Sequence, residues 1–533
     1  MIDPWKQAFM CELSVAEIIN KQANTGVHVN KVKAGFYIHV LNERINALDR
    51  IAVPQMPPEL AKGCTASEPF LKKGGLKANV LNWFEQEGIE FEVSGPFCGV
   101  SWRPFDMGRT EAIKEYLVSL GWRPDEWKFR DLTMHAQLKR PLTPAEQDAT
   151  VEKYMKALKE TNLGKLRMEK LGLKPGTMSK RQVKELLLRK RKVPAGAKLT
   201  EESMKHFEGG EIGTVLKKRL TLAHRRGLLQ GVLKLVRDDG RIEAQAITIG
   251  TPTMRMRHKN VVNIPKAAKY VLFGAHCRAI FESSYCEWDA NPIGIVFSRT
   301  DDKGKVHRTW VPAGRRVLVG YDGAGLELRM LAHYVNDPEY IRQILEGDIH
   351  SYNQALAGLS NRDEAKTFIY AFLYGAGDEK IGQIVGGDRN DGARLRATFL
   401  ESLPALSTLI EKVKSDGEAG YLIGIDGRKL WLRKDGKGRP MTHKALNLLL
   451  QAAGAVVMKY AMILLDEALE AEQLDAWKVI DMHDESQYDV HPRDVKRVRE
   501  LMDICVKKAG ELLGFNIPLA SDSLAGLSWR DCH

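Results

Sequence analysis

The chain has 533 residues, of which 44% are hydrophobic and 8% aromatic, and its formal net charge is +12. This length exceeds what one hydrophobic core usually serves, so we expect several domains. No apolar run approaches the roughly 18 residues of a membrane span, and the first residues lack the charged and apolar regions of a signal peptide. Seven scattered cysteines without a CxxC pair argue against a disulfide framework or a zinc site and favour the cytoplasm.

The N-terminal part of the chain is predicted to be mostly helical. Helices are expected within the segments 11–50, 109–120, 133–194 and 201–236. The segment from about 52 to 99 is rich in Pro and Gly, and we interpret it as a loop-rich insertion or linker. No repeat at a fixed period is found.

One window of the chain carries most of its positive charge. Between Val151 and Lys192 there are 14 Lys or Arg residues and 4 Asp or Glu residues, and the rest of the chain is close to neutral. A basic stripe is the usual footprint of nucleic-acid binding, although a solvated helical face gives the same pattern. The densest charge is the run Arg189, Lys190, Arg191 and Lys192, which we expect to hold nucleic-acid phosphates.

After Val236 the pattern changes to strands with helices at their ends, which indicates an α+β fold. Residues 316–322 form an apolar, β-branched run that ends at Asp322, and residues 477–490 have two strand-like halves around Asp484, which predicts a hairpin. Two carboxylates from separate strands match the needs of two-metal phosphoryl transfer, and Mg²⁺ favours carboxylate and water oxygens. Taken alone, each Asp is better explained as a cap or a turn residue.

A helix is predicted over Asn361–Gly377. Along it Arg362, Lys366, Tyr370 and Tyr374 recur every fourth residue and therefore share one face. Two cations followed by two aromatic rings suit a nucleoside triphosphate, because Arg and Lys bind phosphate and Tyr contacts a base or sugar. By spacing alone a surface helix with a basic end is the simpler interpretation. The combination with the two carboxylates favours the nucleotide.

Together these segments resemble DNA polymerase family A, and most closely the enzymes of short-tailed lytic bacteriophages. The first palm motif of the family is similar to YDGAGLELRMLAH, the fingers helix to RDEAKTFIYAFLYGAGDEK, and the second carboxylate motif to MHDESQ. The matching motifs cover residues 255–533 in the family's order. The resemblance implies a right-hand polymerase fold, with an antiparallel sheet in the palm and helical fingers and thumb. It also implies extension of a primer on a DNA template with dNTPs and two Mg²⁺ ions, in phage DNA replication.

The resemblance implies an order of domains and a set of site residues. The domains would be the N-terminal part of the palm at 1–38, the thumb at 39–230 with insertions at about 52–99 and 133–195, the palm with the first carboxylate at 231–330, the fingers at 331–445, and the palm with the second carboxylate at 446–533. Metal ligands would be Asp322, Gly323 and Asp484, with Glu485 and Lys366 as further catalytic residues. Nucleotide contacts would come from Arg362, Lys366, Tyr370, His350 and Glu327, and primer–template contacts from Tyr374, Gly375, Arg255, Asn447, Gln451 and His483.

The resemblance has two departures. The family's T-G-R element reads Thr253-Met254-Arg255 here, which adds bulk near the primer strand. The relatives carry an exonuclease domain before the polymerase, whereas polymerase-like sequence starts here by about residue 12. We therefore expect no 3′–5′ exonuclease in this chain, and a separately encoded exonuclease would complement it. Some phage relatives bind thioredoxin through an insertion near 52–99, but this segment is short, and we do not expect that partner.

Three alternatives stay open at this point. A single-subunit RNA polymerase has a related palm, but Glu327 together with Tyr370 would crowd a ribose 2′-hydroxyl and exclude ribonucleotides. An inactive DNA-binding relative is disfavoured because Asp322, Asp484 and Lys366 are all present. A gap-filling repair polymerase has the same sequence features as a replicative one, so the sequence does not separate replication from repair.

Overall fold

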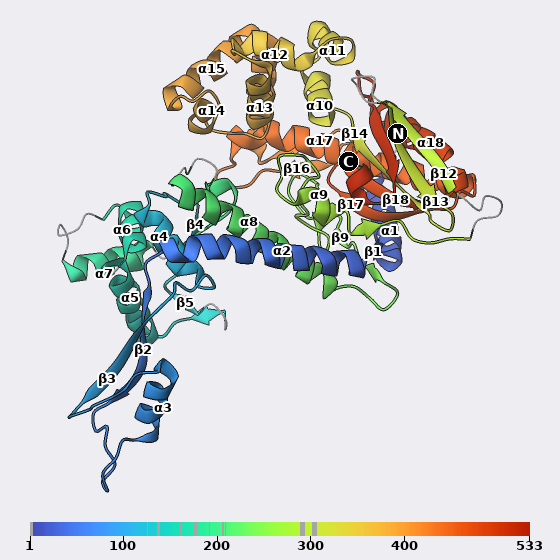
Figure 1. Ribbon diagram of the computed structural model, residues 1–533. Helices are drawn as coiled ribbons and strands as arrows, with labels where there is room; N and C mark the ends of the chain where they lie inside the picture. The colour runs from blue at the N-terminus through green and yellow to red at the C-terminus, as the bar shows by residue number, and fades with distance from the viewer. Residues whose placement is uncertain are drawn as a thin grey trace. The chain divides into compact units, whose positions relative to one another are not determined.

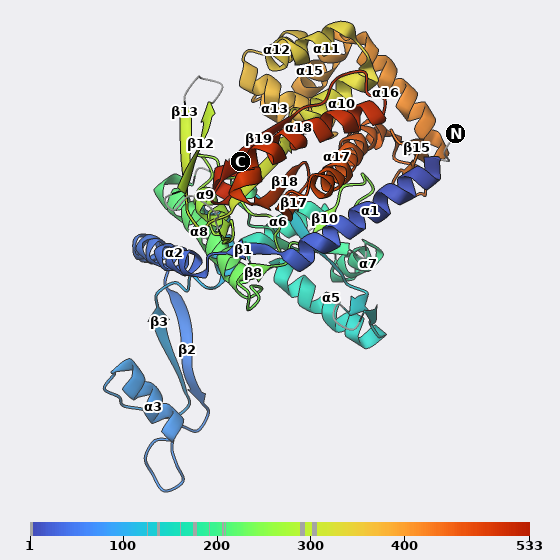
Figure 2. The same cartoon turned by 90° about the vertical axis from the view of Figure 1, so that its right-hand side faces the viewer.

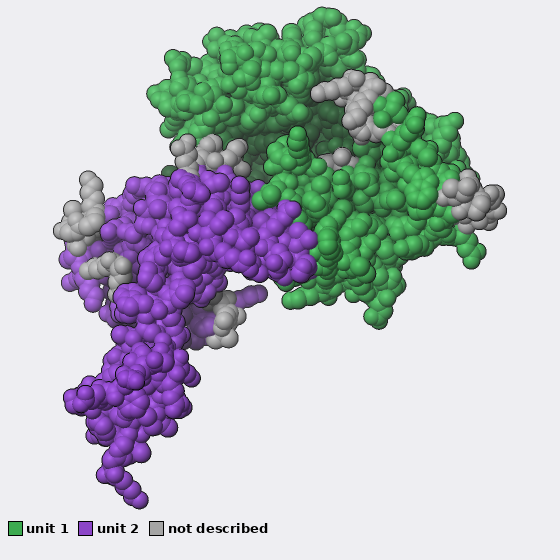
Figure 3. Space-filling model, viewed as in Figure 1, with its two compact units in different colours: residues 1–37, 228–533 green, residues 38–227 purple. Residues whose placement is uncertain are grey.

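The computed structural model describes residues 4–124, 126–135, 139–159, 161–173, 179–190, 192–204, 207, 209–287, 294–300 and 306–532. The chain forms two compact units, which are coloured separately in Figure 3. The first unit consists of residues 1–37 and 228–533, and the second of residues 38–227. The segment 39–230, expected to be a thumb, covers nearly the same residues as the second unit, and its identity as a thumb stays a prediction.

The centre of the first unit is an antiparallel four-stranded sheet in the order β17–β18–β14–β19 (Figure 1). Its strands are Ala476–Met482 (β17), Glu485–Val490 (β18), Val317–Gly323 (β14) and Ser521–Gly526 (β19). β14 is buried along nearly its whole length, which explains its continuous apolar, β-branched sequence. The strand expected at 316–322 and the hairpin expected at 477–490 are therefore confirmed.

Helices pack on this sheet and on one another. α17 (Ala445–Ala471) contacts α18 (Val495–Leu512), α10 (Leu326–Val335) and α1 (Pro4–Thr25), and α17 and α18 lie side by side in Figure 2. Contrary to the expectation from the sequence, the segment Thr442–Ala471 is long and apolar enough to cross a membrane. However, 72% of its most apolar window is buried inside the protein, as in any central core helix.

The segment that connects α10 to α17 forms a layer of helices (Figures 1 and 2). It contains α11 (Pro338–Leu345), α12 (Ile349–Ala357), α13 (Arg362–Leu373), α14 (Asp378–Ile384), α15 (Arg389–Ser402) and α16 (Pro404–Asp416). The side chain of Asn361 caps α13 by accepting a hydrogen bond from the Glu364 N–H. The helix expected over 361–377 ends earlier, at Leu373, because the chain turns at Gly375, whose φ is +75°.

Short elements complete the first unit. The strands are β1 (Val27–Val29), which pairs with β8 (Arg241–Ile242) and β11 (Phe281–Glu282), the pair β9 (Ala246–Ile247) and β10 (Arg257–His258), and the hairpins β12 (Gly294–Thr300) with β13 (Val306–Pro312) and β15 (Tyr421–Ile423) with β16 (Lys429–Trp431). The short helices are α9 (Gly274–Arg278), η3 (Gly417–Ala419), η4 (Thr442–Lys444), η5 (Pro492–Asp494) and η6 (Trp529–Cys532).

The second unit is a separate helical body with small β-ribbons. Its helices are η1 (Val53–Gln55), α3 (Ala78–Glu87), α4 (Thr110–Ser119), α5 (Pro144–Lys159), α6 (Asn162–Leu171), α7 (Lys180–Lys190) and η2 (Glu202–Met204), and α2 (Lys31–Ala52) and α8 (Gly210–Leu233) begin or end in the first unit. Its ribbons are β2 (Glu59–Ala66) with β3 (Phe97–Arg103), β4 (Trp127–Asp131) with β7 (Lys192–Ala197), and β5 (Met134–His135) with β6 (Arg140–Pro141).

Two expectations about the second unit were wrong. The segment 52–99, expected to be loop-rich, forms the β2–β3 ribbon, and α3 packs on it. Two glycines of the ribbon make room for the indole of Trp83, because a Cβ atom would lie 1.2 Å from Nε1 at Gly63 and 2.9 Å from the ring at Gly99. The long helix expected over 201–236 starts only at Gly210, since Gly209 and Gly210 have φ values of +51° and +66°.

Candidate active site

The central sheet brings the two expected metal carboxylates together. Asp322 is the penultimate residue of β14, and Asp484 lies in the two-residue turn between β17 and β18. The N–H group of Gly323 donates to the backbone carbonyl of Asp484 over 3.3 Å, which fixes the strand end against the turn. In the register of the sheet Asp322 stands opposite Glu485. Asp322 and Asp484 are 162 residues apart in the chain (484 − 322), and the pairing of β14 with β18 brings them together.

The electrostatics of these carboxylates fit a bound cation. Burial, reinforced by the charges of Asp484, Glu485 and Glu327, raises the pKa of Asp322 to about 7. Burial also raises the pKa of Asp484, and Glu327 adds to this effect. Oδ1 of Asp322 is buried and has no hydrogen-bond partner. A divalent cation would supply both the missing ligand and the missing positive charge.

The donor set is small, which suits Mg²⁺. Within the described ranges, no group of three or more His, Cys, Asp or Glu side chains is placed to hold a metal. Two carboxylates and a backbone carbonyl such as that of Gly323 leave several coordination positions for water and phosphate oxygens. Mg²⁺ commonly keeps waters and shares substrate phosphates in this way.

The carboxylate of Glu485 is held by a buried network. The NH1 group of Arg278 lies 3.5 Å from each of its oxygens, and Nε2 of Gln487 donates to Oε1 over 2.8 Å. The indole N–H of Trp529 also donates to Oε1, and the Arg278 guanidinium lies 4.3 Å from the centroid of that ring. These donors hold the carboxylate of Glu485 in one position.

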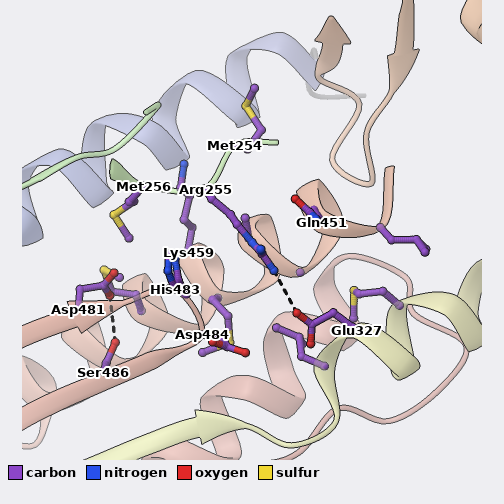
Figure 4. A pocket seen from close by; sticks show the side chains of 17 residues that line it. Met254, Arg255, Met256, Glu327, Gln451, Lys459, Asp481, His483, Asp484 and Ser486 are labelled. Carbon is purple, nitrogen blue, oxygen red and sulfur yellow. Dashed lines mark hydrogen bonds and ion pairs between the residues drawn. The ribbon is translucent and has the colours of Figure 1, made fainter. Parts of the chain in front are cut away.

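A pocket opens beside Asp484 (Figure 4). Its polar lining includes Arg255, Glu327, Gln451, His483 and Asp484, and its apolar lining includes Met254, Met256, Met330, Met458 and Met462. In Figure 4 the guanidinium of Arg255 points to the carboxylate of Glu327, and NH2 lies 3.0 Å from Oε1. Several residues expected from distant motifs therefore share one cavity with Asp484.

Glu327 has an aromatic partner that was not foreseen. The hydroxyl of Tyr374 donates to Oε1 of Glu327 over 2.7 Å, and the expected joint role of Glu327 and Tyr370 at a nucleotide stays a prediction. Tyr374 follows the last residue of α13, so its side chain reaches Glu327 from the helix end. The ring of Tyr370 instead lies 6.1 Å from the ring of His350. Burial raises the pKa of Tyr370, and the charges of Glu327, Asp484 and Asp322 add to the effect.

The face of α13 carries the expected cations beside α12. The guanidinium of Arg362 binds Asp348 through both carboxylate oxygens, at 2.6 Å (Nε–Oδ2) and 3.1 Å (NH2–Oδ1). Burial, followed by the charges of Arg362 and Lys366, lowers the pKa of His350. The structure thus groups Arg362, Lys366 and His350. Asp348 was not foreseen, although an Asp two residues before His350 is a typical N-cap signal.

The proposed DNA contacts fall into two groups. Nδ2 of Asn447 donates to the Leu373 carbonyl over 2.8 Å. Asn447 thus supplies a hydrogen-bond partner to a carbonyl group at the C-terminal end of α13, beside Tyr374 and Gly375. Gln451, one turn further along α17, lines the pocket beside Asp484. The basic run belongs to the second unit: Arg189 and Lys190 end α7 and Lys192 begins β7, whereas Arg191 lies outside the described residues. The ammonium of Lys190 donates to the Leu171 carbonyl over 2.9 Å.

Comparison with known proteins identifies the family. Residues 145–531 match the model of DNA polymerase family A. The chain belongs to this family. A DNA-directed DNA polymerase of Escherichia phage Phieco32 is 38% identical to this family A polymerase, and the alignment covers 100% of both chains. The DNA-directed DNA polymerases of Enterobacteria phage T3 and Escherichia phage T7 are 36% and 35% identical over 56% of this chain and 42% of theirs.

The fold of this family A polymerase is also found in a solved structure. The POL domain of Pol1 from M. smegmatis, in complex with DNA primer-template and dNTP, superposes with a TM-score of 0.60 at 15% sequence identity. The match covers 98% of this chain and 70% of that one. The expected family and the expected right-hand polymerase fold are both confirmed.

Two partners of Glu485 lie far from it in the chain. Only tertiary packing brings Arg278 and Trp529 to its carboxylate, whereas Gln487 is two residues away on β18. Met254 replaces the Gly of the family's T-G-R element, and its φ is +59°. This left-handed conformation favours Gly, so Met254 is strained.

Proposed function

We propose that this family A polymerase extends the 3′-hydroxyl of a primer with dNTPs, directed by a DNA template. The observation that carries the proposal is the convergence of Asp322 and Asp484 at one end of the sheet, next to the pocket of Arg255 and Glu327. The relatives from three phages are named DNA-directed DNA polymerases, which supports the same reaction and a role in phage DNA replication.

The reaction needs charge stabilisation and positioning more than covalent chemistry. Asp322, Asp484 and the Gly323 carbonyl would hold two Mg²⁺ ions, which when bound lower the pKa of the attacking hydroxyl and neutralise charge on the phosphates. Glu485 keeps the local field negative from its fixed position. The carboxylates of Asp322, Asp484 and Glu485 repel one another, and bound cations would relieve this repulsion.

The α12–α13 region would bind the incoming nucleotide. Arg362, Lys366 and His350 would contact the triphosphate, and Tyr370 would lie against the sugar and base. Arg362 offers a bidentate fork to phosphate, and Lys366 a point charge. Glu327, held by Tyr374 and Arg255, would occupy the space of a ribose 2′-hydroxyl and so exclude ribonucleotides.

The primer–template would lie along α17 and the end of α13. Arg255, Asn447, Gln451 and His483 would contact its minor groove, where every base pair offers acceptors in similar places. Tyr374 and Gly375 would shape the position of the templating base. In this proposal residues 1–38, 231–330 and 446–533 are the palm, 331–445 the fingers and 39–230 the thumb, whose Arg189–Lys192 run holds duplex phosphates.

A primer-extension assay tests the proposal. A labelled primer on a DNA template is incubated with Mg²⁺ and with either dNTPs or rNTPs, for the native protein and for Asp484→Ala. We expect extension with dNTPs alone, and its loss in the variant. Extension with rNTPs would favour an RNA polymerase, and DNA binding without any extension would favour an inactive relative. The proposal includes the absence of a 3′–5′ exonuclease, so shortening of the primer without nucleotides would contradict that part.

A further inference from the structure

A second basic segment lies outside the basic window at 151–192. Between Lys429 and Lys444 there are six Lys or Arg residues and one Asp. That Asp, Asp435, pairs with Arg439 at 3.1 Å. Arg433 and Lys444 are exposed and form no ion pair with another described residue. Unpaired positive charge of this kind attracts a polyanion.

The β15–β16 hairpin presents aromatic rings beside this charge. Alternation along β16 buries Leu430 and, just beyond the strand, Leu432 in the core, while Trp431 between them is 60% exposed. Tyr421 stands opposite Trp431 in the register, and their ring centroids are 5.4 Å apart. The ammonium of Lys429 lies 4.6 Å from the Tyr421 ring centroid. A supported, outward-facing indole flanked by cations is the arrangement that stacks a nucleobase.

This surface continues into the proposed DNA contacts. Trp431, Arg433 and Lys444 line a pocket together with Asn447 and Gln451. Gln451 also lines the pocket that contains Asp484. Asn447 bonds to the carbonyl of Leu373, immediately before Tyr374. The pocket therefore adjoins the proposed position of the templating base.

We propose that Trp431, Arg433 and Lys444, here called the Trp431 site, bind the unpaired template strand ahead of the primer terminus. A base inside a duplex has both ring faces covered by its neighbours, so only an unpaired base can stack on Trp431. Arg433 and Lys444 are placed to contact the phosphates on either side of that base. The site rests on the proposed polymerase function, since the template is the strand that remains unpaired there.

Binding measurements with two DNAs test the Trp431 site. One labelled primer–template has a single-stranded 5′ template overhang, and the other is a blunt duplex with the same paired length. Without dNTPs, Trp431→Ala should weaken binding to the overhang DNA at least about five-fold and binding to the blunt duplex less than two-fold, because only the first DNA offers an unpaired base. Trp431→Phe should retain most of the affinity. Arg433→Gln should reduce the salt slope on the overhang DNA by about 0.7.

The β12–β13 hairpin supplies a matched control. Trp310, which is 53% exposed, and Arg308 have the same two-residue spacing as Trp431 and Arg433, and both lie on β13, which pairs with β12. Trp310→Ala and Arg308→Gln should leave both affinities unchanged. If Trp431→Ala lost equal affinity for the two DNAs, or lost none, the Trp431 site would be overturned. The proposed function would still stand if the native protein extended the primer. If the native protein neither bound nor extended the overhang DNA, the proposed function itself would fail.

Discussion

Asp348 binds Arg362 through both carboxylate oxygens, so the guanidinium proposed to receive the triphosphate already has an acidic partner. This pairing holds the pKa of Asp348 well below its usual range. Asp348 also caps α12 by accepting the N–H of His350 over 3.1 Å. An incoming triphosphate would compete with this carboxylate for Arg362, and the carboxylate would repel it.

The variant Asp348→Asn should bind dNTPs more tightly. Asn keeps the N-cap but removes the charge, so we expect the KM for dNTPs to fall about two- to five-fold, as for loss of an exposed charge contact, with kcat little changed. Steady-state kinetics measure both constants. Asp391→Asn, which removes the partner of Arg394 on α15, serves as the control. A higher KM would instead mean that Asp348 holds Arg362 in its binding position.

Loss of the charge at Asp322 should stabilise the protein in the absence of divalent cations. Its pKa is raised from 3.8 to about 7, mainly by burial. The folded protein therefore binds this proton more tightly than the unfolded chain, and stability is lost as pH rises from about 4 to 7. In EDTA at pH 8, the free energy of unfolding of Asp322→Asn should exceed that of the native protein by on the order of 2–4 kcal/mol. Near pH 4 the two proteins should be equally stable.

Thermal unfolding at the two pH values measures this effect. Asp522 stands opposite Asp322 on β19 and is exposed, so Asp522→Asn should leave the melting temperature unchanged at both. A gain for Asp322→Asn that is equal at pH 4 and pH 8 would show that ionisation of Asp322 is not its cause.

At position 254, Gly should be more stable than Ala. Met254 has a φ of +59°, and any L residue is strained there by about 1–2 kcal/mol. The free energy of unfolding of Met254→Gly should therefore exceed that of Met254→Ala by about 1 kcal/mol. Met256 is buried and has no positive φ, so there the usual order, with Ala more stable by about 0.5–1 kcal/mol, should hold. Denaturant unfolding of the four variants gives both differences. The same order at both positions would exclude backbone strain at Met254.

Removal of the indole donor to Glu485 should change the metal requirement. Trp529→Phe keeps an aromatic ring but loses the N–H that binds Oε1. Loss of one hydrogen bond to a charged group should lower kcat about ten-fold and raise the Mg²⁺ concentration for half-maximal rate. Phe281→Leu, which alters the ring packed 5.6 Å from Trp529, controls for packing. If both variants lost activity at an unchanged Mg²⁺ requirement, the role of Trp529 would be structural only.

The basic run should act through Arg189 and Lys192. The double variant Arg189→Gln with Lys192→Gln should reduce the salt slope of duplex binding by about 1.8, since each phosphate contact contributes about 0.9. Lys190 already donates to the Leu171 carbonyl, so Lys190→Gln should lower the melting temperature instead. Arg181 and Lys184 are already ion-paired, and their Gln variants serve as controls. An unchanged salt slope in the double variant would contradict DNA binding by the basic run.

Patterns within a single element were predictable from the sequence. The four-residue spacing of Arg362, Lys366 and Tyr370 placed them on one face of α13, because the helical period depends only on local geometry. The apolar run before Asp322 identified a buried strand for the same reason. By contrast, the β2–β3 ribbon was missed, and two of its glycines, Gly63 and Gly99, are explained only by Trp83, which packs against both.

The sequence alone therefore determined the family of the polymerase, its main elements and the residue types of its site. Tertiary structure alone decided which partner each of these residues meets. Glu327 bonds to Tyr374 and not to Tyr370, and Glu485 faces Arg278 and Trp529. The physical reason is that periodicity fixes only the side of an element on which a side chain lies. Its partner depends on how segments far apart in the chain pack and on which donors that packing leaves available.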